Sequence, residues 1–389
     1  MIISSLSLAL PLALCTPMPQ DPIPDDGAPP VTTDSGLVYS VLSAGERQGP
    51  EPKITDRVVV HYTGWLTNGT IFDSSRQRGQ TAEFGVGQVI AGWTEGLQLM
   101  RPGDRYKFTI PSELAYGENG SPPTIPANAT LIFDVELFEL IEGPPVPVFR
   151  TPAAENAQEH EAGFTYELLS AGEGEAPAEN ESFAMEYSFW NAEGELIDSS
   201  AISGQKLAGN VRQMSLGILQ HAPLMLAPGA RVICEVPASL AFGDREIPKV
   251  PAGSITYWEF SMDRVFRVPE YTPLDEANTV TTTSGLKYQV LAEGEGEAPL
   301  RGQRATVHYA GWLTDGTLFD SSLTTGREFT TPVGVGQVIQ GWDEALQLMK
   351  PGAIYKLHIP WNMAYGEGGR GTIPPRADLI FWVEMLGVN

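Results

Sequence analysis

The chain has 389 residues, of which 48 are Asp or Glu and 24 are Lys or Arg, so its formal net charge is -24 at pH 7. This acidity argues against nucleic-acid binding, which needs a basic face to displace counterions from phosphates, and against attraction to an anionic membrane. Of the two cysteines, Cys15 lies near the N-terminus and Cys234 in an alternating strand pattern. We expect Cys234 to be a small core residue and the chain to hold no internal disulfide.

Residues 1–15 contain an apolar run that is too short to span a bilayer as a helix and is typical of a secretory signal peptide. The segment Leu12-Ala13-Leu14-Cys15 also resembles a bacterial lipoprotein signal, which would place a lipid on Cys15. Both alternatives stay open, because no Lys or Arg precedes the apolar run and Leu14 is bulky for a lipoprotein signal. Residues 16–35 are rich in Pro and Asp and predict a disordered tether.

The rest of the chain repeats one pattern three times. Residues 60–66 and 72–75 return almost letter for letter as residues 307–313 and 319–322, and residues 87–93 return as residues 336–342. A more divergent copy runs over residues 185–243. The period is the length of a domain, so the sequence predicts a tandem array of three globular domains.

We predict a first domain over 36–142, a linker over 143–162, a second domain over 163–267, a linker over 268–284 and a third domain over 285–389. In the first domain, alternating β-branched and aromatic residues predict strands over 37–42, 57–62, 106–110 and 131–137. One helix is predicted over 93–100, ended by Pro102. A short helix among several strands predicts an α+β fold, in which each domain is a curved antiparallel β-sheet wrapped around one short α-helix. Its pocket is expected between helix and sheet.

Five motifs occur in order in the first and third domains: His-Tyr-x-Gly, Phe-Asp-Ser-Ser, Gln-Val-Ile-x-Gly-Trp, Ala-Tyr-Gly, and Ile-Pro followed by Leu-Ile-Phe. Together they make these domains similar to the FKBP-type peptidyl-prolyl cis-trans isomerases, of the sort found in bacterial envelopes. The resemblance implies an isomerase that rotates X-Pro bonds and assists folding, with no cofactor and no metal. It also implies proline-containing unfolded or partly folded polypeptides as partners, and macrolides as inhibitors. With the N-terminal signal, it predicts an exported protein of the periplasm or cell envelope.

The resemblance also implies which residues form the two pockets. Trp93 would be the floor under the proline ring, the Tyr116 hydroxyl and the Ile90 backbone N–H would hold peptide carbonyls, and Asp73 would meet a carbonyl or orient Tyr62. The residues implied in the first domain are Tyr62, Phe72, Asp73, Val89, Ile90, Trp93, Tyr116, Ile125 and Phe133. Those implied in the third are Tyr309, Phe319, Asp320, Phe329, Val338, Ile339, Trp342, Tyr365, Ile373 and Phe381. His61 and His308 alternate with the pocket tyrosines along their strands and are expected to be structural.

The second domain departs from the pattern at the positions that matter. Leu219 stands where the floor tryptophan should be, Ile197 replaces a wall phenylalanine, and Phe242 replaces the tyrosine that carries the hydroxyl. Trp258 takes the place of the last phenylalanine, and Pro223 is expected to disturb the helix. We therefore expect this domain to be inactive, as a spacer or a polypeptide-docking domain. Alternatives for the whole chain are a holdase chaperone or adhesion module that binds without turnover, and a passive spacer.

Overall fold

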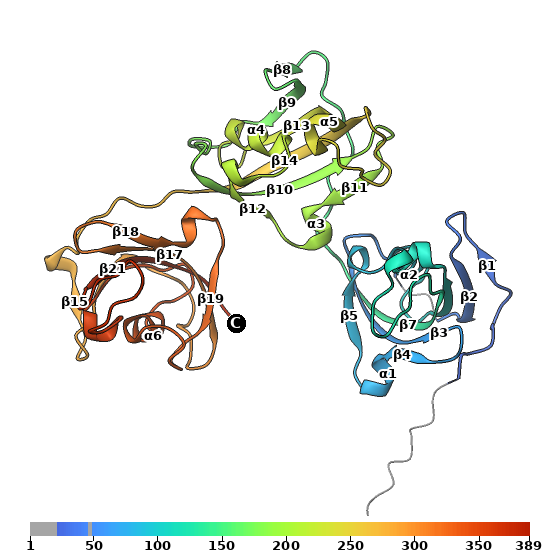
Figure 1. Ribbon diagram of the computed structural model, residues 1–389, viewed down its shortest axis with the longest axis horizontal. Helices are drawn as coiled ribbons and strands as arrows, with labels where there is room; N and C mark the ends of the chain where they lie inside the picture. The colour runs from blue at the N-terminus through green and yellow to red at the C-terminus, as the bar shows by residue number, and fades with distance from the viewer. Residues whose placement is uncertain (1–21, 46–48) are drawn as a thin grey trace, which may run out of the picture. The chain divides into compact units, whose positions relative to one another are not determined.

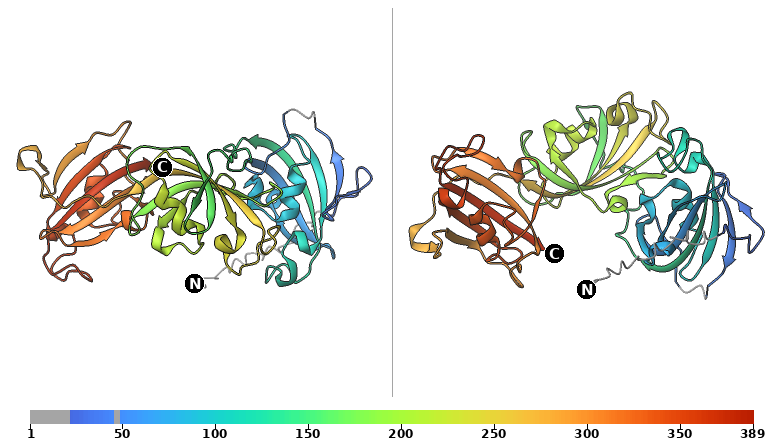
Figure 2. Two further views of the ribbon diagram at one scale, coloured as in Figure 1. Left: turned by 90° about the horizontal axis from the view of Figure 1, so that it is seen from above. Right: turned by 60° about the horizontal axis from the view of Figure 1, so that its bottom comes forward.

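The computed structural model describes residues 22–45 and 49–389. The expected signal peptide, Cys15 and the start of the expected tether lie outside the described residues. The described residues form three antiparallel seven-stranded sheets, each wrapped against short helices, as Figure 1 shows. Figure 2 shows from two further sides how each sheet curves around its own helices. The α+β fold class is therefore confirmed. The chain divides into two compact units, of which the first ends at Pro145 and holds the first domain, and Val146–Asn389 holds the other two.

The sheet of the first domain has the strand order β1-β2-β6-β7-β3-β4, and β5 also pairs with β3. Its strands are β1 (Val31–Thr32), β2 (Val38–Ser43), β3 (Arg57–Leu66), β4 (Ile71–Ser74), β5 (Ala82–Gly85), β6 (Arg105–Ile110) and β7 (Leu131–Ile141). Its helices are α1 (Ser75–Arg78) and α2 (Ala91–Leu97), with 3-10 turns η1 (Val86–Gln88), η2 (Ser112–Leu114) and η3 (Gly117–Asn119). The third domain repeats this order as β15-β16-β20-β21-β17-β18, with β19 on β17.

The elements of the second domain are β8 (Gln158–His160), β9 (Phe164–Ser170), β10 (Ser182–Trp190), β11 (Leu196–Ser199), α3 (Ser200–Ser203), β12 (Leu207–Asn210), η4 (Val211–Gln213), α4 (Ile218–His221), η5 (Ala222–Met225), β13 (Arg231–Pro237), α5 (Ala238–Phe242) and β14 (Ile255–Phe266). Those of the third are η6 (Glu276–Asn278), β15 (Val280–Thr281), β16 (Lys287–Ala292), β17 (Arg304–Leu313), β18 (Leu318–Ser321), η7 (Ser322–Thr324), β19 (Phe329–Pro332), α6 (Gln340–Leu346), β20 (Ile354–Ile359), η8 (Trp361–Met363) and β21 (Leu379–Val388).

Each domain has a core of its own between its sheet and its helices. In β6, buried and half-buried residues alternate along the whole strand, which is the two-residue period of a sheet with one covered face. Helix α2 covers that face with Trp93 and Leu97. It starts two residues before the predicted position and ends at Leu97, because the amides of Leu99 and Met100 bond to carbonyls three residues back and tighten the chain before Pro102.

Helix α4 of the second domain ends at His221, and a 3-10 turn with Pro223 near its start follows directly. Proline removes a backbone donor and clashes inside an α-helix, so the expected disturbance of this helix is confirmed. Cys234 is fully buried in the core of the same domain, as expected.

The segments expected to be a tether and two linkers each contribute a short edge strand to the sheet that follows them, namely β1, β8 and β15. Strands of two or three residues are too short to show an alternating pattern, which is why the sequence does not predict them.

The two predicted linkers also make aromatic contacts. Phe149 packs on Trp190 and Tyr257, and Tyr271 packs on Trp312. No helix among the described residues is long and apolar enough to cross a membrane.

Candidate active sites

The first domain carries a cavity of about 470 Å³ between α2, the sheet and the loop that follows η2. Trp93 projects from the first turn of α2, and its indole is only 4% exposed although it lines this cavity. Three rings meet it almost at right angles. Their centroids lie 5.3 Å (Tyr62), 5.5 Å (Phe84) and 5.2 Å (Phe133) from that of Trp93. Such edge-to-face pairs are favourable and hold the indole in one orientation as the floor.

A glycine in β3 makes room for the wall of this cavity. A Cβ atom on Gly64 would lie 2.6 Å from the ring of Phe72 and 2.8 Å from that of Phe133. The two phenylalanine rings meet edge to face with centroids 5.4 Å apart over this glycine. The last residue of the His-Tyr-x-Gly motif is therefore required by the packing of the pocket wall.

One corner of the cavity is polar. The Tyr62 hydroxyl donates a short hydrogen bond to the carboxylate of Asp73, and Arg78 donates to both groups, at 2.9 Å to the Tyr62 oxygen. Burial, together with the hydrogen bond to Asp73, raises the pKa of Tyr62. Burial alone would raise the pKa of Asp73, but the hydrogen bonds from Tyr62 and Arg78 lower it overall. Asp73 is therefore held as a carboxylate and Tyr62 as a neutral phenol.

The third domain rebuilds the same arrangement around a cavity of about 720 Å³. Trp342 is 5% exposed. The centroids of three neighbouring rings lie 5.1 Å (Tyr309), 5.8 Å (Phe329) and 5.3 Å (Phe381) from the centroid of its ring. Tyr309 donates to Asp320 over 2.7 Å. A Cβ atom on Gly311 would lie 2.6 Å from Phe381 and 2.7 Å from Phe319, as in the first domain.

Nearly all the residues expected in the two pockets are brought together. In the third domain all ten line the cavity, and in the first domain all line it except Ile125, which is buried in the core. The amides of Ile90 and Ile339 stand at the starts of α2 and α6, where backbone N–H groups lack partners within the helix. His61 and His308 contact Ser75 and Ser322 and line neither cavity, as expected of structural residues.

Both cavities are also lined by residues that were not predicted, namely Phe84, Gln88, Gln337 and a rim formed by Arg370, Gly371 and Thr372. Phe84 and Phe329 each pack a ring on the floor tryptophan of their domain, but they do so from different strand positions. Phe84 pairs with Val58 in its sheet, whereas Phe329 pairs with Val307, which is the counterpart of Val60. An alignment of the repeats therefore does not pair the two phenylalanines. The alternation of Glu83 and Phe84 next to a buried strand is the only signal that indicates this residue.

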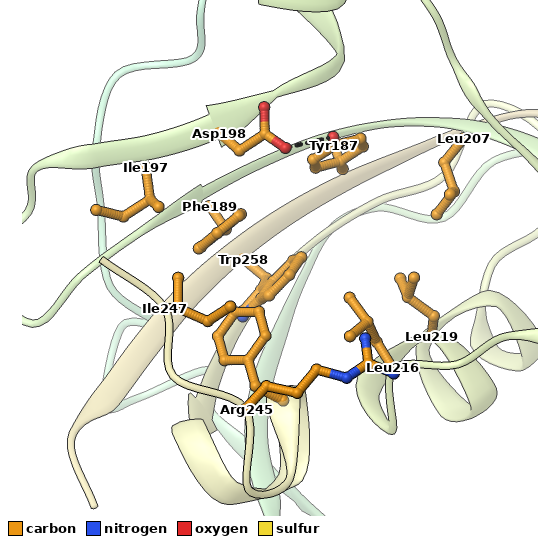
Figure 3. Close-up of a pocket in the computed structure, with 11 residues that line it drawn as sticks. Tyr187, Phe189, Ile197, Asp198, Leu207, Leu216, Leu219, Arg245, Ile247 and Trp258 are labelled. Atoms are coloured by element: carbon orange, nitrogen blue, oxygen red, sulfur yellow. Dashed lines mark hydrogen bonds between the residues drawn. The ribbon is translucent and has the colours of Figure 1, made fainter. Parts of the chain in front are cut away.

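The second domain has a cavity of about 410 Å³ at the corresponding place, shown in Figure 3. Leu219 and Ile197 line it, Trp258 comes from β14, and Phe242 stands where Tyr116 and Tyr365 stand in the other domains. Of the polar corner, Tyr187 and Asp198 remain, joined by a hydrogen bond of 2.8 Å. The residues described around this cavity therefore include neither a helix-borne indole nor a rim hydroxyl at the matching place.

Comparison with known proteins bears on the first and third domains. The family model of the FKBP-type peptidyl-prolyl cis-trans isomerases matches residues 49–138 and 295–386, which hold both tryptophan-floored cavities. The first and third domains belong to this family. A probable FKBP-type isomerase of Haemophilus influenzae is 56% identical over 109 residues, covering 28% of this chain and 44% of that protein.

Two further FKBP-type proteins extend the comparison. The isomerase FKBP9 of Rattus norvegicus is 27% identical over 343 residues, covering 86% of this chain and 55% of its own length. The crystal structure of AtFKBP13 is 35% identical, with a TM-score of 0.28, over 28% of this chain and 98% of that one. The chain spans about half the length of the curated relatives that it matches.

Proposed function

We propose that this chain is a peptidyl-prolyl cis-trans isomerase that acts through its first and third domains. One observation carries the proposal: the same box of a tryptophan and three perpendicular aromatic rings beside a Tyr–Asp pair occurs twice, at Trp93 and at Trp342. A hydrophobic core needs apolar volume, but it does not need the same Tyr–Asp hydrogen bond at matched positions.

Such a box suits amide rotation. The C–N bond of a peptide has partial double-bond character, and rotation about it costs roughly 18–20 kcal/mol. No bond is made or broken, so the reaction needs no nucleophile. At the twisted midpoint resonance is lost and the carbonyl is less polar than in the planar amide. A water-excluding aromatic pocket therefore disfavours the planar ground state relative to the twisted state.

The individual roles follow from position. Trp93 forms the floor under the proline ring, and the hydroxyl of Tyr116, which is 41% exposed at the rim, donates to a substrate carbonyl. The Ile90 N–H at the start of α2 holds a second carbonyl. Asp73 fixes the Tyr62 hydroxyl and thereby the wall of the pocket. The third domain uses Trp342, Tyr365, Ile339 and Asp320 in the same way.

The substrates are proline-containing segments of unfolded or partly folded polypeptides, and the chain works after export. The apolar run over residues 1–15 supports export. A cavity open at the rim, with an exposed tyrosine hydroxyl, supports an extended peptide as the ligand.

The test is cis–trans exchange of a proline peptide, measured by NMR with the full chain. Trp93→Leu and Trp342→Leu should each remove part of the exchange rate, and the double variant should lose nearly all of it. Trp361→Leu is the matched control, because Trp361 lies outside the cavity and packs under Arg376. Wild-type protein that suppresses aggregation without accelerating exchange would instead be a holdase, and the proposal would fail.

A further inference from the structure

The second domain keeps an open, mostly apolar cavity although it has lost the tryptophan floor. The other two domains carry an indole on their helix, whereas this domain carries its indole and an additional phenylalanine ring on strands of the sheet. Phe189 occupies the position of Gly64 and Gly311, and its ring stacks on Trp258 with centroids 4.3 Å apart and planes 12° apart. Leu219 on α4 takes the place of the helix-borne indole. The added ring and the lost ring offset each other in volume, so the cavity persists at about 410 Å³.

This rebuilt cavity does not fit prolyl isomerisation. The flat indole face for a proline ring is replaced by flexible leucine side chains, Leu216 and Leu219. Phe242 is 8% exposed and offers no hydroxyl for a carbonyl. The indole N–H of Trp258 already donates to the Thr256 hydroxyl over 2.9 Å. The lining therefore favours a linear or branched apolar side chain that is held by burial alone.

The lining of the cavity holds one carboxylate and one guanidinium, from Asp198 and Arg245. The carboxylate of Asp198 accepts hydrogen bonds from the Tyr187 hydroxyl at 2.8 Å and from the Ser199 amide at 2.7 Å. Arg245 is exposed, lines the cavity on the side opposite Asp198 in Figure 3, and forms no ion pair with any described residue. Its sequence neighbours Asp244 and Glu246 do not line this cavity. The group that remains available to a ligand is thus a guanidinium, which pairs best with a carboxylate.

We propose that this cavity binds, without isomerising it, a polypeptide segment that presents a large apolar side chain next to an Asp or Glu. The apolar side chain enters between Leu216, Leu219 and Trp258, and the neighbouring carboxylate pairs with Arg245. The use of this site rests on the proposed function. A polypeptide held here keeps its prolyl bonds at high effective concentration near the other two pockets.

The experiment uses the full chain and three labelled, proline-free peptides that carry Leu-Glu, Leu-Lys or Ala-Glu at their centre. Binding is measured by fluorescence anisotropy. The Leu-Glu peptide should bind at least about fivefold more tightly than the other two. Arg245→Glu should weaken the Leu-Glu peptide about tenfold and remove its preference over Leu-Lys. Arg212→Glu changes the net charge equally, on an exposed arginine paired with Glu179 in the same domain, and should leave binding unchanged.

Two further outcomes decide the matter. The Trp93→Leu, Trp342→Leu double variant should bind the Leu-Glu peptide as the wild type does, whatever its exchange rate. Loss of binding in that variant would place the peptide in the other pockets and overturn the inference, as would binding that Arg245→Glu leaves intact. Retained exchange in the double variant would overturn the proposed function instead. Prolyl exchange on a short peptide should be the same in Arg245→Glu and the wild type, which shows that the first and third domains are intact. An unchanged urea-unfolding profile should show that the second domain is folded as well.

Discussion

Arg78 bonds to both partners of the Tyr62–Asp73 pair in the first domain, and no described residue of the third domain supplies such a cation. The position that matches Arg78 is Thr325, whose hydroxyl bonds to the carbonyl of Ser322. The Tyr309–Asp320 pair therefore keeps a carboxylate that forms no ion pair with any described residue. The two pockets thus share their aromatic box but differ in whether a cation bonds to the Tyr–Asp pair, because Arg370 of the third pocket lies over the ring of Tyr365 instead.

Removing this cation should change the pH dependence of the first domain. Arg78 helps to hold the pKa of Asp73 below its usual value, so Arg78→Thr should raise that pKa. A carboxylate that is protonated at higher pH loses its hydrogen bond from Tyr62 earlier on acidification. The acid limb of kcat/KM should shift to higher pH, by less than about one unit because the pair is partly exposed. The measurement uses a Trp342→Leu background, which isolates the first domain.

Arg101→Thr is the control for this shift, since it breaks an exposed ion pair with Glu51 elsewhere in the same domain. An acid limb that moves equally in both variants would assign the effect to net charge. An acid limb that does not move in Arg78→Thr would exclude Asp73 as the titrating group.

The glycine of the pocket wall in the third domain should tolerate no side chain. Gly311→Ala forces the rings of Phe319 and Phe381 to move, because its Cβ would lie 2.7 and 2.6 Å from them. Overpacking of this kind costs about 1–3 kcal/mol. We expect exchange by the third domain to fall about tenfold in a Trp93→Leu background, with a lower midpoint of unfolding.

Gly387→Ala provides a matched control on a neighbouring strand of the same sheet, because a Cβ atom at this position would meet nothing within 4 Å. It should leave the exchange rate and the unfolding midpoint nearly unchanged. Equal effects of the two alanines would mean that the loss comes from replacing a glycine in a strand and not from a clash with the phenylalanine rings of the pocket wall.

The strand patterns with one short helix were enough to predict the fold class, and the family resemblance carried by the recurring motifs implied almost the whole of both pockets. The pairs Tyr62–Asp73 and Tyr309–Asp320 could be predicted because both members stand in contiguous motifs on paired strands. Ile125 shows the limit of this reasoning. It follows a loop that is one residue longer than that of the third domain and does not line its cavity, whereas Ile373 does, although both side chains are buried in their cores.

The rebuilt middle cavity could be predicted only in part. The replacements at Leu219, Ile197 and Phe242 are visible in the sequence, and they indicate the loss of a catalytic pocket. That a cavity remains depends on how Phe189 and Trp258 stack across two strands. Such packing is decided by ring orientation in three dimensions, which the linear pattern of apolar residues does not specify.

The buried His308 should make stability depend on pH. Its Nδ1 lies 3.0 Å from the Ser322 hydroxyl, and burial, with the positive charge of Arg264, lowers its pKa to about 4, although Glu384 acts in the opposite direction. The unfolded chain binds this proton near pH 6.5. Between these two values the unfolded state holds more protons, so the free energy of unfolding falls as the pH falls.

Urea unfolding at pH 7 and at pH 4.5 checks this expectation. The wild type should lose about 2 kcal/mol more than His308→Gln over this interval. Glutamine keeps a polar side chain near Ser322 but takes up no proton, so it separates the charge effect from the packing effect. An equal loss in both proteins would show that the histidine does not titrate in this way.

Phe84 should prove essential to the first pocket although no motif contains it. Its ring meets Trp93 at 5.5 Å and Tyr62 at 5.7 Å, and each such contact contributes about 0.5–1.5 kcal/mol. Phe84→Ala should therefore lower exchange by the first domain about tenfold, in the Trp342→Leu background. Phe138→Ala is the control, since that ring is 47% exposed and packs on His61, away from the cavity.

The matching change in the other site, Phe329→Ala in a Trp93→Leu background, should reduce exchange by the third domain to a similar degree. The two phenylalanines reach their tryptophans from different strand positions. Equal losses would therefore mean that each pocket requires a third ring beside its tryptophan, whichever strand position supplies that ring. A loss in one domain only would show that the two boxes hold the proline ring differently, with Phe84 or Phe329 serving as core packing alone.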